Sequence, residues 1–451
     1  MFFQNSIKAE ILRRRDMRDV FTFTVDPADA KDFDDAISFE YLAAEGDLTG
    51  EADLTSNSAA VYRIGVHIAD VSFYVKPGTK IDDDAYQRGT SVYLVDRVLP
   101  MLPEELCNDK CSLRPGEEKL CMSVVFTMDA DARVLKHKIC RTVICSDARL
   151  NYEEAQAIIS GENRTGGISE ALCTLNALAQ KLRAERIANG ALTIEQDEMR
   201  FRLDKSGHPV EIYFEHPNEA HHLIEEFMLL ANRTVATTVG SGRPFVYRVH
   251  DLPDYDKLEE VKKFKRSCAM TAKMRHHEVS EEAVRRAVDM LTIRAHAKAV
   301  YSTYNIGHYG LAFSHYTHFT SPIRRYPDLM VHRLVEKYIL TGKKETMTRE
   351  EMEEKCEHCS ACEQEATQAE RDSIKMYQAM WMNDHIGEEL DGFITGITDF
   401  GFFVQLRESR CEGLVHMMTI EHPEDFVLGD KVTVKVVRVD INRSQIDFEL
   451  V

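Results

Sequence analysis

Residues 25–38 read VDPADAKDFDDAIS, and this stretch carries the densest chemistry in the chain. It follows the apolar run FTFTV, so we expect a strand that ends in an acidic loop. The loop holds five aspartates: Asp26, Asp29, Asp32, Asp34 and Asp35. Carboxylates this close repel one another unless cations neutralise them. Hard oxygen ligands on one stiff loop favour Mg²⁺ or Mn²⁺.

A solvated surface loop is the other interpretation of this aspartate cluster. Apolar residues between the aspartates, such as Phe33 and Ala36, indicate that the loop lies against a core, and Pro27 stiffens its entry. An EF-hand is excluded, because Ile37 stands where that loop needs glycine. The pattern therefore favours a divalent metal site. Two such ions can activate a water and hold the leaving oxygen of a phosphodiester.

Basic and aromatic residues supply the groups that a phosphodiester would need. The segment HYTHFTSPIRRYPDLMVHR begins at His315, and its prolines predict a fixed turn that leads into a helix. Arg324 or Arg325 could simply bridge surface carboxylates, but beside an acidic metal loop a guanidinium that binds phosphate is favoured. Tyr93 lies in a proline-closed stretch, where it either packs or offers a stacking surface for a base.

The cysteines predict no metal centre. Cys356, Cys359 and Cys362 have CxxCxxC spacing, but the segment has the pattern of one continuous helix and no fourth cysteine is near in the sequence. Structural cysteines are the favoured interpretation. Zinc-protease, Walker A and serine-hydrolase motifs are absent from the sequence.

Composition excludes several classes of protein. The 451 residues carry a net charge of -19, which argues against a histone-like or membrane-surface protein but leaves room for a local basic channel. No apolar run approaches the roughly 20 residues that span a bilayer. The 11 scattered cysteines suit reduced thiols. We therefore expect a cytoplasmic protein with no membrane partner.

The pattern of apolar residues predicts a mixed α/β (α+β) unit followed by an all-β module. The predicted strands lie in 18–26, 61–75 and 121–146, and the predicted helical regions are 152–189, 221–240, 255–300 and 349–385. A polar surface loop is expected at 41–60. The texture changes near Gly387 to short alternating strands, so we predict domains 1–386 and 387–451.

Several motifs in order carry a resemblance to a known family: VDPADAKDFDDAIS, HIADVSFYV, YLVDRVLPMLPEELCNDKCSLRPGEEKL, LIEEFMLLAN, YRVHDLP and HFTSPIRRYPDLMVHR. Together they resemble the RNase II/RNase R (RNB) family, and its bacterial RNase R branch in particular. The resemblance covers about residues 7 to 385 as an RNB catalytic domain. Residues 387–451 resemble an S1-like OB-fold that binds RNA.

This resemblance implies a processive, Mg²⁺-dependent exoribonuclease, in which Mn²⁺ can replace Mg²⁺. Such enzymes hydrolyse single-stranded RNA from a free 3′ end and release nucleoside 5′-monophosphates. The four catalytic-site aspartates of the family fall on Asp26, Asp32, Asp34 and Asp35. We expect the loss of Asp34 to be the most damaging, because it lies centrally in the cluster.

The resemblance also implies a set of RNA-binding residues. The stacking tyrosine of the family falls on Tyr93, its phosphate-contacting arginine on Arg324 with Arg325 beside it, and a glutamate in QAERD on Glu370. In the all-β module, alternation along ITDFGFFVQL predicts that Phe400 and Phe402 share one face. We expect these two and His416 to grip upstream RNA.

Two departures from the family and two rival functions remain. The chain has no room for the two N-terminal cold-shock domains that the family normally has, and it stops at Val451 without a basic tail, so we expect a truncated form. We expect a monomer without a small-molecule cofactor. The rivals are a catalytically weak RNA-binding protein on the same fold, and a metal-dependent nuclease that cuts internally or acts on DNA.

Overall fold

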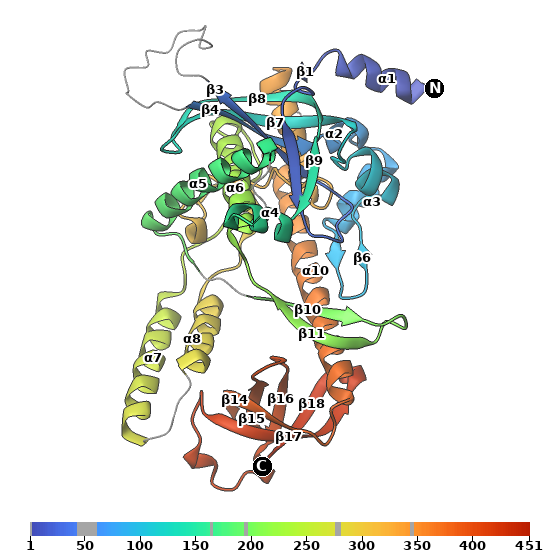
Figure 1. The fold of residues 1–451 in the computed structure, drawn as a ribbon. Coiled ribbons are helices and arrows are strands. Elements are labelled where there is room, and N and C mark those ends of the chain that lie inside the picture. Colours follow the sequence, from blue (N-terminus) through green and yellow to red (C-terminus); the bar gives the residue numbers. More distant parts are fainter. Residues whose placement is uncertain (1, 43–60, 163–165, 194–196, 276–280, 343–346) are drawn as a thin grey trace.

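The structure is a computed structural model that describes the chain except for residues 1, 43–60, 163–165, 194–196, 276–280 and 343–346. A mixed α/β body forms its upper part, and a closed barrel formed by the last 63 residues lies below it (Figure 1). The predicted order, an α/β unit followed by an all-β module, is therefore confirmed. Most of the predicted loop at 41–60 lies outside the described residues.

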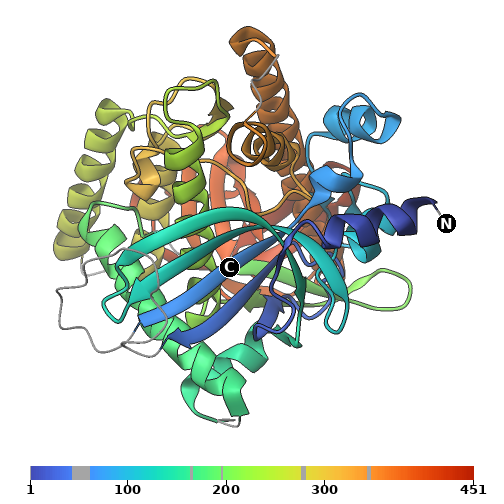
Figure 2. The same cartoon turned by 90° about the horizontal axis from the view of Figure 1, so that it is seen from above.

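A seven-stranded sheet, in the order β1-β8-β7-β4-β3-β2-β9, forms the top of the body. Figure 2 looks down on its strands, with the barrel beneath. The middle of the sheet is antiparallel, whereas β1 joins β8 and β9 joins β2 in parallel. Its strands are β1 Arg15–Asp16, β2 Thr22–Asp26, β3 Asp35–Leu42, β4 Val61–Ala69, β7 Glu118–Asp129, β8 Val134–Cys145 and β9 Ala148–Asn151.

Helices pack beneath this sheet, and their buried faces join the strands in one hydrophobic core. Phe227 of α6 and Phe126 of β7, both fully buried, belong to that core. Asn218 caps α6, since its side chain accepts from the backbone N–H of His221. The helices of the body are α1 Phe2–Ile11, α2 Val71–Tyr74, α3 Lys80–Arg88, α4 Tyr152–Ser160, α5 Gly166–Ala188, α6 Glu219–Val239, α7 Tyr255–Arg275, α8 Glu281–Ala295, α9 Tyr326–Val335 and α10 Arg349–Asn383.

The expected helical regions are confirmed in position, with three refinements. The region 152–189 forms two helices, because Gly161 adopts a left-handed conformation that ends α4. The strand expected over 61–75 ends at Ala69, where the side chain of Asp70 caps the short helix α2. Residues 300–302, at the end of the expected helical region 255–300, form a short strand.

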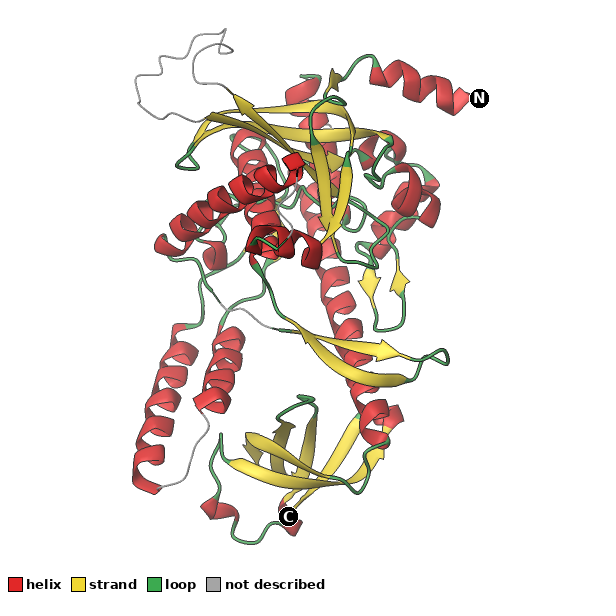
Figure 3. Ribbon diagram, in the orientation of Figure 1, coloured by secondary structure: helices red, strands yellow, loops and turns green. Residues whose placement is uncertain are grey.

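Helix α10 connects the body to the barrel (Figure 3). Thr348 and Glu351 form a capping box at its start, as favoured for a helix entered from a loop. Near its end, Trp381 packs on the barrel core and Met382 is fully buried in it. The barrel core therefore begins before residue 387, where the texture of the sequence changes.

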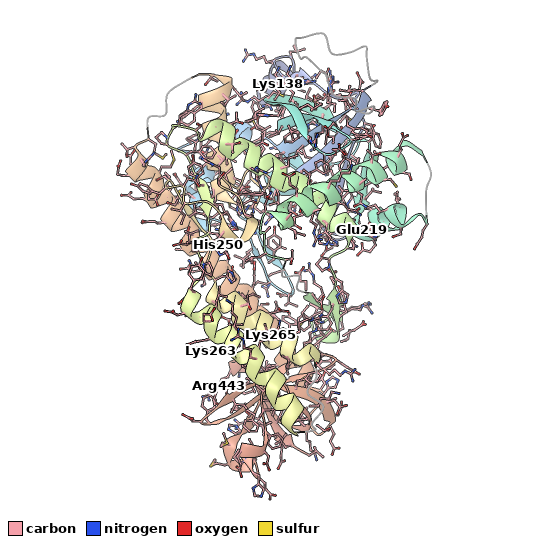
Figure 4. The ribbon with its side chains drawn as sticks, turned by 90° about the vertical axis from the view of Figure 1, so that its left-hand side faces the viewer. Lys138, Glu219, His250, Lys263, Lys265 and Arg443 are labelled. Atoms are coloured by element: carbon pink, nitrogen blue, oxygen red, sulfur yellow. The ribbon has the colours of Figure 1, made fainter. Side chains whose placement is uncertain are left out.

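The barrel has the strand order β14-β15-β16-β18-β17, which is the five-stranded closed architecture expected for an OB-fold. Figure 4 shows α7, with Lys263 and Lys265, running above the barrel residue Arg443. The barrel strands are β14 Glu389–Thr398, β15 Gly401–Leu406, β16 Glu412–His416, β17 Lys431–Asp440 and β18 Gln445–Leu450.

Within the described residues, three two-stranded sheets complete the fold. The hairpin β10–β11 lies between the body and the barrel, where Phe201 contacts Tyr377 of α10 and Ile212 packs on the barrel core. Their strands are β5 Val92–Tyr93, β6 Val98–Leu99, β10 Glu198–Leu203, β11 Pro209–Glu215, β12 Tyr247–Val249 and β13 Val300–Ser302. Short π or 3-10 segments are η1 Glu105–Lys110, η2 Tyr309–Leu311, η3 Glu336–Leu340, η4 Met417–Thr419, η5 Pro423–Asp425 and η6 Ile441–Arg443.

Among the helices that the structure describes, none combines the length and the apolar character needed to span a lipid bilayer.

Candidate functional site

The acidic loop joins β2 to β3, in the middle of the body. Asp26 is the last residue of β2, Asp35 is the first residue of β3, and Asp32 and Asp34 lie in the loop between them. Asp26 and Asp34 are buried, whereas Asp32 and Asp35 are partly exposed. Adjacent strands of one sheet thus hold both ends of the loop, so its carboxylates are fixed by the core.

Arg149 of β9 braces this loop. Its Nη2 donates to the carbonyl oxygens of Pro27, at 2.7 Å, and Ala28, at 2.9 Å. The same guanidinium lies over the ring of Phe33, 5.2 Å from the centroid. It also provides positive charge near Asp26. One arginine therefore contacts the loop at its start and near its end.

Burial raises the pKa of all four predicted metal ligands. The pKa of Asp26 rises to about 8, because burial and the nearby Asp35 both disfavour its charge. Burial raises the pKa of Asp35 to about 6, although Arg324 opposes the change. The pKa of Asp34 lies well above its usual value and that of Asp32 is also raised, again mainly through burial. These carboxylates lie in an environment that favours a bound cation.

The donor chemistry of the loop fits a hard divalent cation such as Mg²⁺. The Oδ2 atom of Asp26 is buried and has no hydrogen-bond partner within the described part of the chain. Over those same residues, no three histidine, cysteine, aspartate or glutamate side chains converge into a ready-made metal site. Mg²⁺ does not need one, since it usually takes one or two carboxylates together with waters and substrate phosphates.

The arginine segment lies directly against Asp34. The backbone N–H of Ile323 donates to Asp34 Oδ1 at 2.9 Å, and Nε of Arg324 lies 4.0 Å from Asp34 Oδ2. The side chain of Arg324 is 41 % exposed and also donates to the hydroxyl of Ser321. Its guanidinium is therefore accessible beside the carboxylates.

Arg325 is placed differently from Arg324. Its guanidinium is mostly buried and donates to Asp328 Oδ1 at 2.8 Å. The carboxylate of Asp328 is a main cause that holds the pKa of Arg325 above its usual value, against the opposing effect of burial. Arg325 is therefore engaged in an internal ion pair, whereas Arg324 is the more accessible guanidinium, and the RNA contact expected of Arg325 stays a prediction.

Tyr93 lies on the hairpin β5–β6 and is 41 % exposed. Partial burial raises the pKa of its hydroxyl, and the charges of Arg324, Asp32 and Asp34 act on it. The tyrosine thus lies close enough to the acidic loop and to Arg324 for their charges to act on it. The carboxylate of Glu370 accepts from the backbone N–H of Tyr93 at 2.9 Å, so Glu370 contacts the predicted stacking residue itself.

A cavity of about 570 Å³ opens beside Asp35 and Arg324. The ring of Tyr152 stacks on His221 within its lining, with the centroids 3.8 Å apart. Glu225 of α6 also lines it. Sequence reasoning missed this set, because α4 reaches the acidic loop through the parallel pairing of β9 with β2, and α6 packs beside α4 and β4. The register Asp26–Asn151 places Tyr152 next to the site.

The barrel separates two phenylalanines that were expected to share one face. Phe402 is buried in the barrel core, so the expectation that it binds RNA is wrong. Phe400 is 57 % exposed because it lies in the turn before β15, where strand alternation does not apply. Its ring contacts Phe403 edge-on, 6.0 Å away. His416 is half exposed, with Nε2 3.4 Å from Asp447 Oδ1.

The three cysteines of α10 line one helix, as expected. Cys356 and Cys359 are buried and Cys362 is partly exposed. Burial raises the pKa of all three thiols, which keeps them protonated. Cys356 and Cys359 belong to the hydrophobic core, which supports a structural role for these two.

Comparison with known families and structures gives a consistent result. Residues 14–341 match the RNB domain family, and residues 383–450 match the S1 RNA binding domain family. The Ribonuclease R of Aquifex aeolicus (strain VF5) is 39 % identical over 478 residues, which cover 98 % of this chain. The chain spans 65 % of the length of that relative.

Two solved structures share the fold. The structure of Mycoplasma genitalium RNase R in complex with ribose methylated single-stranded RNA has a TM-score of 0.83 and 26 % identity, covering 97 % of this chain and 72 % of that one. The structure of yeast Ssd1, a pseudonuclease, has a TM-score of 0.72 and 20 % identity, covering 95 % and 52 %. The second likeness concerns the fold alone.

Proposed function

Since the chain belongs to the RNB family, we propose that it is a hydrolytic 3′→5′ exoribonuclease that degrades single-stranded RNA to nucleoside 5′-monophosphates. The observation that carries the proposal is the meeting of Asp34 with Ile323, 289 residues further along the chain, and with the adjacent Arg324. A carboxylate cluster and an accessible guanidinium thereby lie side by side at the edge of a large cavity. The fold alone would not suffice, because a pseudonuclease shares it.

Asp26, Asp32, Asp34 and Asp35 would hold Mg²⁺, and Mn²⁺ can take its place. When bound, the cation supplies the positive charge that assists hydrolysis of a phosphodiester. Arg324 is positioned to bind the non-bridging oxygens of the scissile phosphate, since its guanidinium presents planar paired donors. The peptide N–H of Ile323 orients Asp34 through its Oδ1 and leaves Oδ2 on the side of Arg324.

The cavity would receive the 3′-terminal nucleotide, and Tyr93 would stack on a base nearby without reading sequence. A stacked base is worth roughly 1–3 kcal/mol, which suits a residue that grips every sequence alike. Phe400 and His416 would contact RNA upstream, on the barrel. Because all these residues belong to one chain, we propose that a monomer suffices.

The proposal is tested with 5′-labelled RNA, the same sequence as DNA, and Mg²⁺ or a chelator. We expect a ladder that shortens from the 3′ end, free nucleoside 5′-monophosphates, little cleavage of DNA and no cleavage with the chelator. Internal fragments or equal cleavage of DNA would favour an endonuclease. Tight RNA binding without any product would favour an RNA-binding protein that has lost catalysis.

A further inference from the structure

The hairpin that carries Tyr93 is too short to hold itself in place. It pairs only Val92 with Leu99 and Tyr93 with Val98, and its turn is closed by one bond from Leu94 N–H to the carbonyl of Arg97. An isolated two-stranded hairpin is marginal in water even when longer. The position of the Tyr93 ring must therefore be fixed by contacts from other elements.

Helix α10 supplies two such contacts, and it runs beside this hairpin (Figure 3). Glu370 Oε1 accepts from the backbone N–H of Tyr93 at 2.9 Å, and the hydroxyl of Ser373 accepts from the backbone N–H of Val95 at 3.1 Å. Glu370 and Ser373 are three residues apart, so they lie on one face of the helix. The N–H groups of Tyr93 and Val95 both point toward α10, since each bonds to a side chain of that helix. The helix side chains thus replace a neighbouring strand.

The other side of the hairpin is attached to the arginine segment. The backbone N–H of Ser91 donates to the carbonyl of Arg324 at 2.9 Å, and the hydroxyl of Thr90 donates to the same carbonyl. The hydroxyl of Ser91 accepts from the N–H of Met101, where the hairpin ends. The base of the hairpin is therefore tied to Arg324, and its far part is tied to α10.

We propose that Ser373 is a positioning residue which, together with Glu370, holds Tyr93 at a fixed distance from Arg324 and thereby sets the length of the shortest RNA that is degraded. The inference rests on the proposed function, in which Tyr93 stacks on a base and Arg324 binds the scissile phosphate. Ser373 does not touch RNA in this scheme. Its hydroxyl acts through the peptide of Val95.

The consequence for short RNA differs from that for long RNA. A short RNA is held by few contacts, so a displaced stacking residue removes a large share of its binding. A long RNA keeps its contacts on the barrel. Loss of one hydrogen bond of about 1 kcal/mol at the hairpin corresponds to about a fivefold weaker hold on short RNA.

The test compares Ser373→Ala with Ser373→Thr, which restores the hydroxyl. Thr367→Ala is the matched control, because the Thr367 hydroxyl donates to the carbonyl of Glu363 within α10 itself. For each folded variant we measure the length of the limit product, the KM for a short RNA, and the kcat on a long RNA. Hydrogen exchange of the amides in 90–97 is followed in the same proteins.

For Ser373→Ala we expect faster exchange at Val95, a longer limit product, and a KM for short RNA raised about three- to tenfold, with kcat on long RNA within twofold. Ser373→Thr and Thr367→Ala should match the parent. Unchanged exchange at Val95 would refute the proposal that Ser373 holds the hairpin. Faster exchange with an unchanged limit product would refute its role in product length. If the parent protein releases no nucleotides, the proposed function is refuted instead. The exchange data then test only whether Ser373 holds the hairpin.

Discussion

The backbone N–H of Ile323 donates a 2.9 Å hydrogen bond to Oδ1 of Asp34. This bond joins the acidic loop to the arginine segment and fixes the orientation of a buried carboxylate. An asparagine at this position would keep the acceptor oxygen and the shape of the side chain but would lose the charge. The chemistry of the site can therefore be separated from its architecture at Asp34.

For Asp34→Asn we predict a loss of hydrolysis with RNA affinity nearly unchanged, because Arg324 and Tyr93 remain in place. Single-turnover cleavage at saturating enzyme and equilibrium RNA binding measure the two effects. A variant that retains more than about a tenth of the parent rate, a loss under about 1.4 kcal/mol in the barrier, would show that Asp34 is not central.

For Tyr93→Ala we predict a longer limit product without loss of activity on long RNA. One stacked base contributes roughly 1–3 kcal/mol, which matters most where few other contacts exist. Tyr93→Phe keeps the ring and should give the parent product. If both variants give the parent product, the stacking role must belong to another residue.

For Arg149→Met we predict Mg²⁺ binding about tenfold weaker, since the loop loses its bonds at Pro27 and Ala28 and the cation over Phe33. Titration calorimetry with Mg²⁺ measures this without any activity assay. Arg133→Met, at an exposed turn between β7 and β8, is the control. An unchanged Mg²⁺ affinity in Arg149→Met would show that Arg149 does not hold the acidic loop in its metal-binding shape.

For the barrel we predict opposite effects from two neighbouring phenylalanines. Phe400→Ala should weaken RNA binding and leave the melting temperature unchanged, because the ring is exposed. Phe402→Ala should destabilise the barrel by about 3–5 kcal/mol, because its ring fills the core. Binding and thermal unfolding measured on both variants check the assignment, which fails if Phe400→Ala binds RNA like the parent.

Acid should destabilise the body through His67. This residue is fully buried between Ser38 and Ser123, and burial lowers its pKa to about 3. The unfolded chain takes up a proton below about pH 6.5 and the folded chain does not, so stability falls as the pH drops from 6.5 toward 3. At pH 5 this contribution is about 2 kcal/mol. His67→Gln should be less stable than the parent at pH 7. Its free energy of unfolding in denaturant should change less with pH over this range. An equal change with pH would show that the acid sensitivity comes from other residues.

The sequence predicted the parts of the site that lie in one segment. The strand before Asp26, the turn at Pro322 and the helix after it have local signals in apolar runs and prolines, and all three are present. The closed barrel could likewise be expected from alternating strands separated by turn residues.

The parts that the sequence did not predict depend on tertiary packing. Tyr152 reaches the site because β9 pairs with β2. No local sequence pattern predicts a parallel pairing between strands so far apart in the sequence. Arg324 and Arg325 are chemically identical in the sequence, yet Asp328 engages only the second. Strand alternation predicts one face for Phe400 and Phe402, but it does not hold through the turn at Phe400.

The contacts that β2 and the acidic loop make with distant parts of the chain have a consequence for folding during translation. The N–H of Thr22 bonds to Asp147, 125 residues later, and Asp34 meets Ile323 only after 289 residues. A nascent chain that has not yet reached Ile323 holds the aspartates without this partner. The carboxylate site is thus completed only after the arginine segment has been translated, and chains released before that point lack it.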